Sequence, residues 1–284
     1  MVKKRITYTD LWQSLTDIYG AGEAQAIVRM VMDNEFNMSF ADLLCDGLDR
    51  ITSQKRQMLD SIMDRLSTGE PLQYVIGNVN FADRTINVKS GVLIPRMETE
   101  ELCQAIVEEN KDQPAGCSIL DIGTGSGCIA ITLALDVPNS KVTAWEWSDE
   151  ALKIAKNNIK DEEVDITLVK QDALNPPDEA DLWNIIVSNP PYVCEQERAA
   201  MDKNVLDFEP EMALFVPDDD PLLFYRAIGK YAIKALKHGG KLYFEINPRF
   251  ADNMVTMLTD LGFCNVETKD DSCGKERFIK VMRK

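Results

Sequence analysis

The feature that most constrains the fold is a regular alternation of short apolar runs and longer amphipathic segments after about residue 98. We expect strands over 118–121, 141–146, 166–169, 182–188, 241–246, 263–268 and 277–282, and helices over 99–109, 128–135, 150–159, 222–236 and 251–261. Strands separated by helices of this length are typical of a mostly parallel sheet covered on both faces. The sequence therefore predicts an α/β fold around a seven-stranded, mostly parallel sheet.

The first quarter of the chain has a different pattern. Apolar residues at three- and four-residue spacing predict helices over 8–19, 22–36, 40–51 and 54–66, and Ser39 with Asp42 resembles a capping box. Two β-prone runs, 72–77 and 85–88, follow between turn-forming residues and predict a hairpin. We expect a small helical domain over 1–70, a hairpin linker over 71–95 and a catalytic domain over 96–284.

The charge of the chain limits its partners. The 284 residues carry a net charge of −16. Binding to a phosphate backbone relies on Lys and Arg that displace counterions, and an acidic chain is repelled by it at long range. The composition therefore disfavours a nucleic-acid partner and suits a basic protein partner.

The start of the chain and the cysteines indicate the cellular compartment, and the single histidine bears on metal binding. The basic start has no apolar core segment behind it, so we expect no signal peptide, and no apolar run is long enough to cross a membrane. Seven scattered cysteines without a Cys-x-x-Cys pair favour reduced thiols in the cytoplasm over disulfides or zinc. The single histidine, His238, is expected in an exposed turn, so we expect no metal site.

A glycine-rich segment indicates a nucleotide-type cofactor. Ile119 to Gly127 ends a buried strand and opens a helix, with glycines in a Gly-x-Gly-x-Gly pattern. Glycine lets the backbone approach a ligand, and the amides of a helix N-terminus face that ligand. The spacing differs from that of dinucleotide sites, which disfavours an NAD-dependent dehydrogenase. Glu146 ends the next strand, where its carboxylate can accept hydrogen bonds from both ribose hydroxyls.

The second motif, Asn189-Pro190-Pro191-Tyr192, follows the fourth expected strand. Two prolines fix φ and cannot donate hydrogen bonds, so they make a rigid loop with free carbonyl acceptors. The Asn189 side-chain oxygen and the Pro190 carbonyl match the two donors of a planar NH2 group, and Tyr192 offers an apolar face. Acceptors on both N–H bonds would return electron density to a delocalised nitrogen and stabilise the charge that develops there.

The glycine segment, together with Glu146 and Asp172, resembles the first motif of class I S-adenosylmethionine-dependent methyltransferases. The resemblance implies a Rossmann-like fold with S-adenosylmethionine as the cofactor. It places Asp121 beside the methionine moiety, Asp172 and Ala173 beside the adenine, and Asn189 near the methyl donor. The same resemblance gives a cofactor-binding role to the loop residues Gly123, Thr124, Gly125, Ser126 and Gly127.

Two further segments, Leu93–Leu102 with its Ile-Pro-Arg-x-x-Thr-Glu pattern and Phe208–Phe215, resemble the PrmC/HemK family. That family methylates the side-chain amide of the glutamine in the Gly-Gly-Gln motif of peptide chain release factors. The resemblance implies that the residues from Asn189 to Tyr192 hold this amide and that the helical domain helps to hold the release factor. It also implies that Arg96 and Glu98 help to shape the cofactor pocket.

The chain departs from the usual pattern of this family at three places. Glu146 replaces the usual Asp, Met97 replaces a Pro, and Asn247-Pro248 replaces a Gly-containing sequence. These departures concern local loop geometry rather than the chemistry of the two motifs.

Two alternatives share the same motifs. The Asn-Pro-Pro-Tyr loop also serves enzymes that methylate adenine or guanine amino groups, although we find no basic stripe that would hold nucleic acid. A binding module that only senses S-adenosylmethionine would keep the fold without the intact acceptor loop found here.

Residues 195–220, with nine acids against two bases, would attract a basic surface on a release factor.

Overall fold

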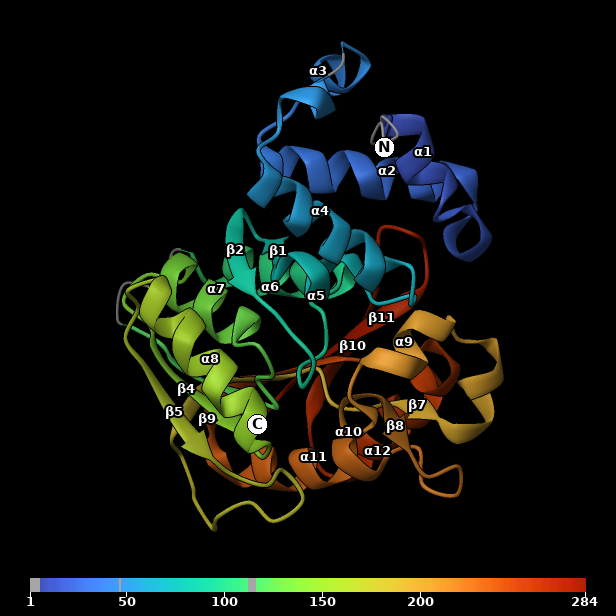
Figure 1. Ribbon diagram of the computed structural model, residues 1–284. Coiled ribbons are helices and arrows are strands. Elements are labelled where there is room, and N and C mark those ends of the chain that lie inside the picture. The colour runs from blue at the N-terminus through green and yellow to red at the C-terminus, as the bar shows by residue number, and fades with distance from the viewer. Residues whose placement is uncertain (1–5, 46, 112–115) are drawn as a thin grey trace. The chain divides into compact units, whose positions relative to one another are not determined.

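The computed structural model describes residues 6–45, 47–111 and 116–284, so the first five residues of the basic start discussed above lie outside it. The chain divides into two compact units (Figure 1). One runs from the N-terminus to Asn78 and includes Asp202–Phe208; the other comprises Val79–Met201 and Glu209–Lys284. Of the described helices, none is both long and apolar enough to span a membrane.

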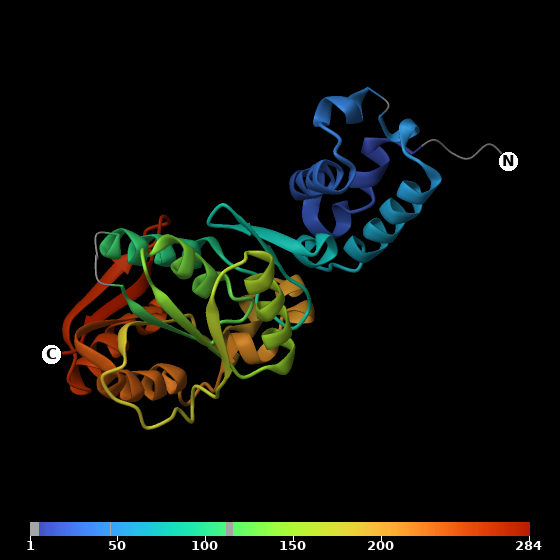
Figure 2. The same ribbon diagram turned by 90° about the vertical axis from the view of Figure 1, so that its left-hand side faces the viewer.

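In the first unit, the helices within residues 8–76 pack around one apolar core (Figure 2, blue). Leu15, Val28, Met32, Leu59 and Leu66 are fully buried in this core. The elements are α1 (Tyr8–Gln13), α2 (Thr16–Phe36), α3 (Phe40–Leu44), η1 (Gly47–Arg50), α4 (Ser53–Leu66), α5 (Leu72–Ile76) and α9 (Lys203–Phe208).

Helix α2 differs from the prediction because it runs through residues that were expected to separate two helices. The expected helix over 8–19 is wrong: α1 ends at Gln13, and α2 continues across a kink at Gly20, where φ is +73°. Glycine adopts this left-handed conformation without a Cβ clash. The predicted capping box is confirmed, since Ser39 Oγ accepts from the Asp42 amide and Asp42 Oδ2 accepts from the Ser39 amide.

The first expected strand of the hairpin, 72–77, is also wrong, because Leu72–Ile76 forms helix α5. Pro71 precedes the helix, and Gly77, with φ of +85°, ends it, an arrangement that favours a short helix. Arg65 donates hydrogen bonds to the carbonyls of Tyr74 and Val75 near its end. Burial of the apolar side chains of α5 therefore outweighs their β propensity.

A two-stranded sheet does form, but its first strand lies later than expected. Strand β1 (Asn78–Phe81) pairs with β2 (Arg84–Asn87) across Ala82 and Asp83. Both turn residues have positive φ, +49° and +60°, which is the conformation of the tight turns that match strand twist.

The second unit is built on the predicted seven-stranded, mostly parallel sheet. Its order is β10-β11-β9-β6-β3-β4-β5, and only β11 runs antiparallel to its neighbours. The strands are β3 (Ser118–Ile122), β4 (Lys141–Glu146), β5 (Ile166–Lys170), β6 (Trp183–Ser188), β9 (Leu236–Glu245), β10 (Cys264–Asp270) and β11 (Glu276–Met282).

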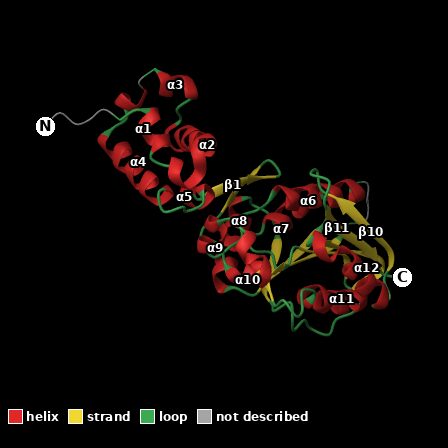
Figure 3. Cartoon of the chain, turned by 90° about the vertical axis from the view of Figure 1, so that its right-hand side faces the viewer, coloured by secondary structure: helices red, strands yellow, loops and turns green. Residues whose placement is uncertain are grey.

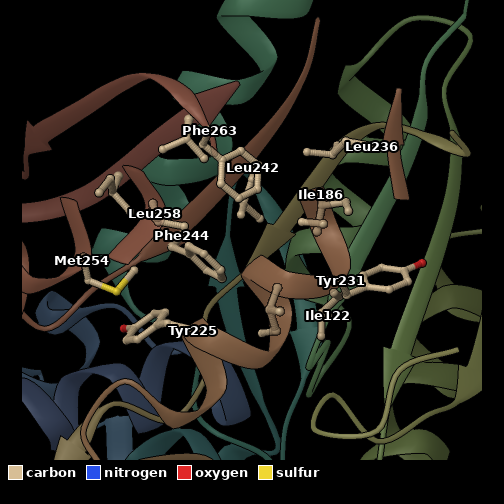
Figure 4. Close-up of a cluster of buried hydrophobic side chains, with 14 of the residues drawn as sticks. Ile122, Ile186, Tyr225, Tyr231, Leu236, Leu242, Phe244, Met254, Leu258 and Phe263 are labelled. Carbon is tan, nitrogen blue, oxygen red and sulfur yellow. The ribbon is translucent and has the colours of Figure 1, made fainter. Parts of the chain in front are cut away.

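Helices cover both faces of this sheet. Figure 3 shows α6 (Met97–Asn110) and α7 (Cys128–Asp136) on one face, and α11 (Leu223–Ala235) and α12 (Ala251–Asp260) on the other. Helix α8 (Asp149–Asp161) follows β4 and packs on β4 and β5. On the α11 and α12 face, Ile186 and Phe244 of the sheet pack with Tyr225 and Met254 (Figure 4). This apolar layer fixes the strands whose ends carry the site.

The region between β6 and α11, which includes the acidic residues 195–220, contains short ordered elements. Strands β7 (Val193–Cys194) and β8 (Phe215–Val216) pair in parallel, and Cys194 and Val216 are buried. Two-residue strands have no readable hydrophobic period, so the sequence does not reveal them. The remaining elements are η2 (Glu195–Ala200), α10 (Glu211–Leu214) and, after β9, η3 (Pro248–Phe250).

Two glycines in α2 provide a matched test of the kink. Gly22 has ordinary helical φ and a Cβ would meet nothing within 4 Å, so Gly22→Ala should raise the free energy of unfolding by about 0.5–1 kcal/mol. Gly20→Ala should lower it by about 1–2 kcal/mol, because alanine is strained at this positive φ. Urea unfolding followed by circular dichroism measures both changes. Equal effects of the two substitutions would contradict the kink at Gly20.

Candidate active site

The register of the central strands brings four chain segments to one edge of the sheet. Ile122 at the end of β3 pairs with Trp145 of β4 and with Ser188 of β6, and Ser188 pairs with Phe244 of β9. Ser188 Oγ also donates to the Ile122 carbonyl at 2.6 Å. The residues that follow these strand ends therefore lie side by side, where open α/β sheets bind ligands.

The glycine loop makes the predicted sharp turn from β3 into α7. Gly123, Gly125 and Gly127 all have positive φ, of +77°, +56° and +88°. The amides of Gly123 and Thr124 both donate to the Trp145 carbonyl at 2.9 Å, which holds the loop against β4. A residue with a Cβ would be strained at each of the three glycines.

The Glu146 side chain accepts hydrogen bonds from backbone amides of the glycine loop and of the residues that directly follow β4. Its Oε2 accepts from the Gly125 amide at 2.9 Å, and its Oε1 accepts from the amides of Trp147 and Ser148 at 2.8 Å. A carboxylate offers about four acceptor positions, so about one remains, on Oε2. The sequence predicts that Glu146 accepts hydrogen bonds from both ribose hydroxyls. In the structure, however, most of the acceptor positions of this carboxylate are already used to hold the glycine loop and the residues after β4.

Asp121 lies behind the glycine loop. It is fully buried, and Thr124 Oγ1 donates to its Oδ2 at 2.6 Å. Its other oxygen, Oδ1, makes no hydrogen bond with a described residue. Burial raises the pKa of Asp121 to about 7, and the hydrogen bond from Thr124 opposes this shift. Asp121 thus supports the loop from within the protein.

A cavity of about 390 Å³ opens beside this loop, within the size range of small-molecule sites. It brings together most of the residues selected from the sequence but not Asp121, Gly127 or Tyr192. The selected residues that line it are Gly123, Thr124, Gly125, Ser126, Glu146, Asp172, Ala173, Asn189, Pro190 and Pro191.

The cavity also has apolar walls that sequence reasoning missed. Leu93 and Pro95 precede α6, Phe224 lies on α11, and Phe215 belongs to β8. Trp147 lines it as well and is 55% exposed, with Lys170 Nζ 5.4 Å from its ring centroid. Trp147 carries a sequence signal because it directly follows Glu146, and Leu93, Pro95 and Phe215 lie in the two segments that carry the family resemblance. Phe224 carries no such signal, and only the fold brings it to the cavity.

Asp172 and Ala173 form a tight turn after β5 on the cavity wall. The two carboxylate oxygens of Asp172 accept from the Leu174 amide at 2.8 Å and from Asn175 Nδ2 at 2.6 Å. Asp172 therefore fixes the shape of this turn, and Ala173 lies in the middle of it.

The Asn-Pro-Pro-Tyr loop follows β6 directly. Asn189 Nδ2 donates to Thr99 Oγ1 at 3.1 Å, and no described residue donates to Asn189 Oδ1 or to the Pro190 carbonyl. Tyr192 instead donates from its hydroxyl to Glu245 Oε1 at 3.0 Å and packs against the apolar core. Burial raises the pKa of Tyr192. The loop thus presents two unengaged acceptors beside the glycine loop.

Arg96 connects the two segments that carry the family resemblance. Its guanidinium forms an ion pair with the buried carboxylate of Glu209, which also accepts from the Ile94 amide at 3.0 Å. Leu93 and Pro95 on one segment and Pro210 on the other line the cavity. Neither Arg96 nor Glu98 lines it, so Arg96 shapes the cavity by holding its wall.

Comparison with known proteins identifies the family. Residues 81–207 match the model of the methyltransferase small domain, and residues 13–77 match that of the PrmC N-terminal domain. A release factor glutamine methyltransferase of Bacteroides thetaiotaomicron is 44% identical over 95% of this chain and 97% of its own length. Another, from Flavobacterium psychrophilum, is 38% identical over 96% of each chain. The chain belongs to the release factor glutamine methyltransferase family.

A solved structure supports the fold of this family member. A methyltransferase from Pyrococcus furiosus matches 70% of this chain and 88% of its own with a TM-score of 0.50 at 19% identity. The resemblance to the PrmC/HemK family and the expected class I methyltransferase fold are therefore confirmed.

The structure accommodates the departures from the usual family pattern. Asn247 Nδ2 donates to the Tyr192 carbonyl at 3.2 Å and to Glu197 Oε2 at 3.0 Å, so the Asn-Pro sequence fixes the end of the acceptor loop. Met97 is the first residue of α6 and is 72% exposed. The position where the family usually has a proline therefore does not contribute to the core, and methionine is accommodated there.

The pKa of Asp121 gives a test of its burial. Between its ordinary pKa near 4 and about 7, the folded state binds more protons at this carboxyl than the unfolded state, so its contribution to stability is lost as pH rises. Asp121→Asn removes this dependence. We therefore expect the free energy of unfolding of the variant, relative to the native protein, to increase as pH is raised from about 5 to about 8. Urea denaturation at several pH values measures it, and a constant difference would contradict the assignment.

Proposed function

We propose that this protein transfers a methyl group from S-adenosylmethionine to the side-chain amide nitrogen of the glutamine in the Gly-Gly-Gln motif of peptide chain release factors. The observation that carries the proposal is the pair of unengaged acceptors, Asn189 Oδ1 and the Pro190 carbonyl, on the wall of the cavity that the glycine loop also lines. The names of the similar proteins, release factor glutamine methyltransferases, support the choice of substrate.

The cavity residues fit a nucleoside-type methyl donor. Gly123 and Gly125 leave the loop backbone open to close approach, Glu146 Oε2 keeps one acceptor position for a ribose hydroxyl, and Ala173 would border the adenine. Asp121, which the family resemblance places beside the methionine moiety, does not line the cavity and would act through Thr124, which does. S-adenosylmethionine supplies a methyl group on a sulfonium, which is already activated for in-line displacement.

The protein residues then have to orient the acceptor nitrogen. An amide nitrogen is a weak nucleophile because its lone pair is delocalised. Hydrogen bonds from its two N–H groups to Asn189 Oδ1 and the Pro190 carbonyl return density to nitrogen and stabilise the developing charge. Pro190 and Pro191 hold this geometry because their φ is fixed. No base is required, since the proton leaves after transfer.

The remaining parts of the chain suit a protein substrate. We assign the helical unit, whose residues 13–77 match the PrmC N-terminal domain, to holding the release factor. Part of the acidic segment 195–220 is already engaged, because Asp220 pairs with Arg226 and Arg198 pairs with Glu195 and Glu211. The acids of this segment for which the structure shows no ion pair, such as Asp219, would then attract the basic surface.

Methyl transfer tests the acceptor loop. The native protein should label purified release factor with methyl-labelled S-adenosylmethionine, and Asn189→Ala should lower kcat by about a hundred- to a thousandfold, because one stabilising acceptor is lost. Asn253→Ala, an exposed change on α12, is the control. Parallel reactions with tRNA, rRNA and DNA address the alternative: label on nucleic acid alone would favour an amino-group methyltransferase of bases.

Cofactor affinity tests Glu146. Glu146→Ala removes the last free acceptor position and three backbone hydrogen bonds, so we expect the Kd for S-adenosylmethionine to rise by about ten- to a hundredfold. Isothermal titration calorimetry measures it, with the exposed Asp165→Ala as control. An unchanged Kd would show that the cofactor does not lie against this carboxylate.

A further inference from the structure

Behind the acceptor loop lies a buried chain of hydrogen bonds that the two sequence motifs do not explain. Asn189 Nδ2 donates to Thr99 Oγ1 at 3.1 Å, and Thr99 Oγ1 donates to Glu245 Oε2 at 2.7 Å. Thr99 lies on α6 and Glu245 at the end of β9, and they are only 3% and 1% exposed. We propose that Thr99 and Glu245 are positioning residues that lock the Asn189 side chain with its oxygen toward the acceptor nitrogen. This inference rests on the proposed function.

The direction of the chain follows from the number of protons. A hydroxyl has one proton, and Thr99 Oγ1 donates it to Glu245 Oε2. Toward Asn189, Thr99 can therefore only accept a hydrogen bond. The NH2 end of the Asn189 amide must face Thr99, because the opposite orientation would place Oδ1 against an oxygen lone pair. Oδ1 is thereby turned to the cavity side as an acceptor.

Glu245 is itself held in place by groups from several elements. Tyr192 donates its hydroxyl to Glu245 Oε1 at 3.0 Å, and Tyr225 of α11 donates to the Glu245 backbone carbonyl at 3.0 Å. Arg277 of β11 favours the charged form of Glu245, and Glu98 of α6 opposes it. Burial raises the pKa of Glu245, while the hydrogen bonds from Thr99 and Tyr192 lower it. With both oxygens accepting, the side chain has one fixed rotamer.

This lock has a consequence for specificity. Two acceptors, Asn189 Oδ1 and the Pro190 carbonyl, match a carboxamide with two N–H donors. They oppose a carboxylate, which would place an oxygen against each acceptor. A reversed Asn189 amide would instead present a donor and would tolerate a glutamate in place of the glutamine. Thr99, although it also lines the cavity, and Glu245 would therefore set the preference for an amide through the orientation of Asn189.

Glu245→Gln should reverse the orientation of the Asn189 side-chain amide, with little change in the shape of the side chain at position 245. The hydroxyl of Tyr192 needs an acceptor, so the new amide must turn its oxygen to Tyr192 and its NH2 group to Thr99. In Glu245→Gln, Thr99 then accepts from the introduced NH2 group and donates to Asn189, whose amide must turn its oxygen away from the substrate. Thr99→Val breaks the chain differently, because it leaves Asn189 Nδ2 without its partner, and Thr99→Ser keeps the hydroxyl and the chain.

The experiment measures methylation and binding separately. Steady-state kinetics with purified release factor should show kcat lowered by about ten- to a hundredfold in Glu245→Gln and Thr99→Val, and near-native kcat in Thr99→Ser. The Kd for S-adenosylmethionine and the circular dichroism spectrum should remain those of the native protein in all three, which excludes misfolding. A native kcat in both Glu245→Gln and Thr99→Val would overturn the inference.

A second readout distinguishes positioning from general support. Binding of two release factors, one with Gly-Gly-Gln and one with that glutamine replaced by glutamate, is compared by calorimetry in the presence of S-adenosylhomocysteine. The native protein should prefer glutamine, and Glu245→Gln should reduce or invert the ratio of the two Kd values. An unchanged ratio would overturn the inference. Because binding needs no methyl transfer, failure of the native protein to methylate a release factor counts against the proposed function alone.

Discussion

The parallel register of β3, β4, β6 and β9 is the constraint on which the site depends. Pairing of Ile122 with both Trp145 and Ser188, and of Ser188 with Phe244, aligns four strand ends at one edge of the sheet. A shift of one residue would turn each buried side chain to the opposite face and misplace the loops that follow. The apolar layer under α11 and α12 (Figure 4) fixes this register, and two of its members, Ile122 and Ile228, also line the cavity, so packing of the core determines the geometry of the cavity.

Charged and polar side chains then hold the loops at that edge. Glu146 fastens the glycine loop through the Gly125 amide, Asp121 supports Thr124 from inside, and Arg96 ties the apolar wall to Glu209. Each of these groups is bonded to the protein before any ligand enters. A carboxylate that sequence motifs associate with a ligand can therefore serve the loop as well.

Long elements and contiguous motifs were predictable from the sequence, whereas contacts between distant segments were not. The seven strands and the glycine turn follow from periodicity and from residues that tolerate positive φ. Leu72–Ile76 was misread because burial against the helical core outweighs β propensity, and β7 and β8 are too short to show a period. The role of Glu245 was not predictable from the sequence, since its contacts with Thr99 and Tyr192 span 146 and 53 residues.

The three amide hydrogen bonds of Glu146 have a consequence for the energetics of ligand capture. A loop with three glycines would ordinarily lose much backbone entropy when it closes around a small molecule. Here Gly125, Trp147 and Ser148 are already anchored to one carboxylate, so that entropy is lost during folding rather than at the moment of association. A preorganised cradle of this kind leaves more of the contact energy for affinity.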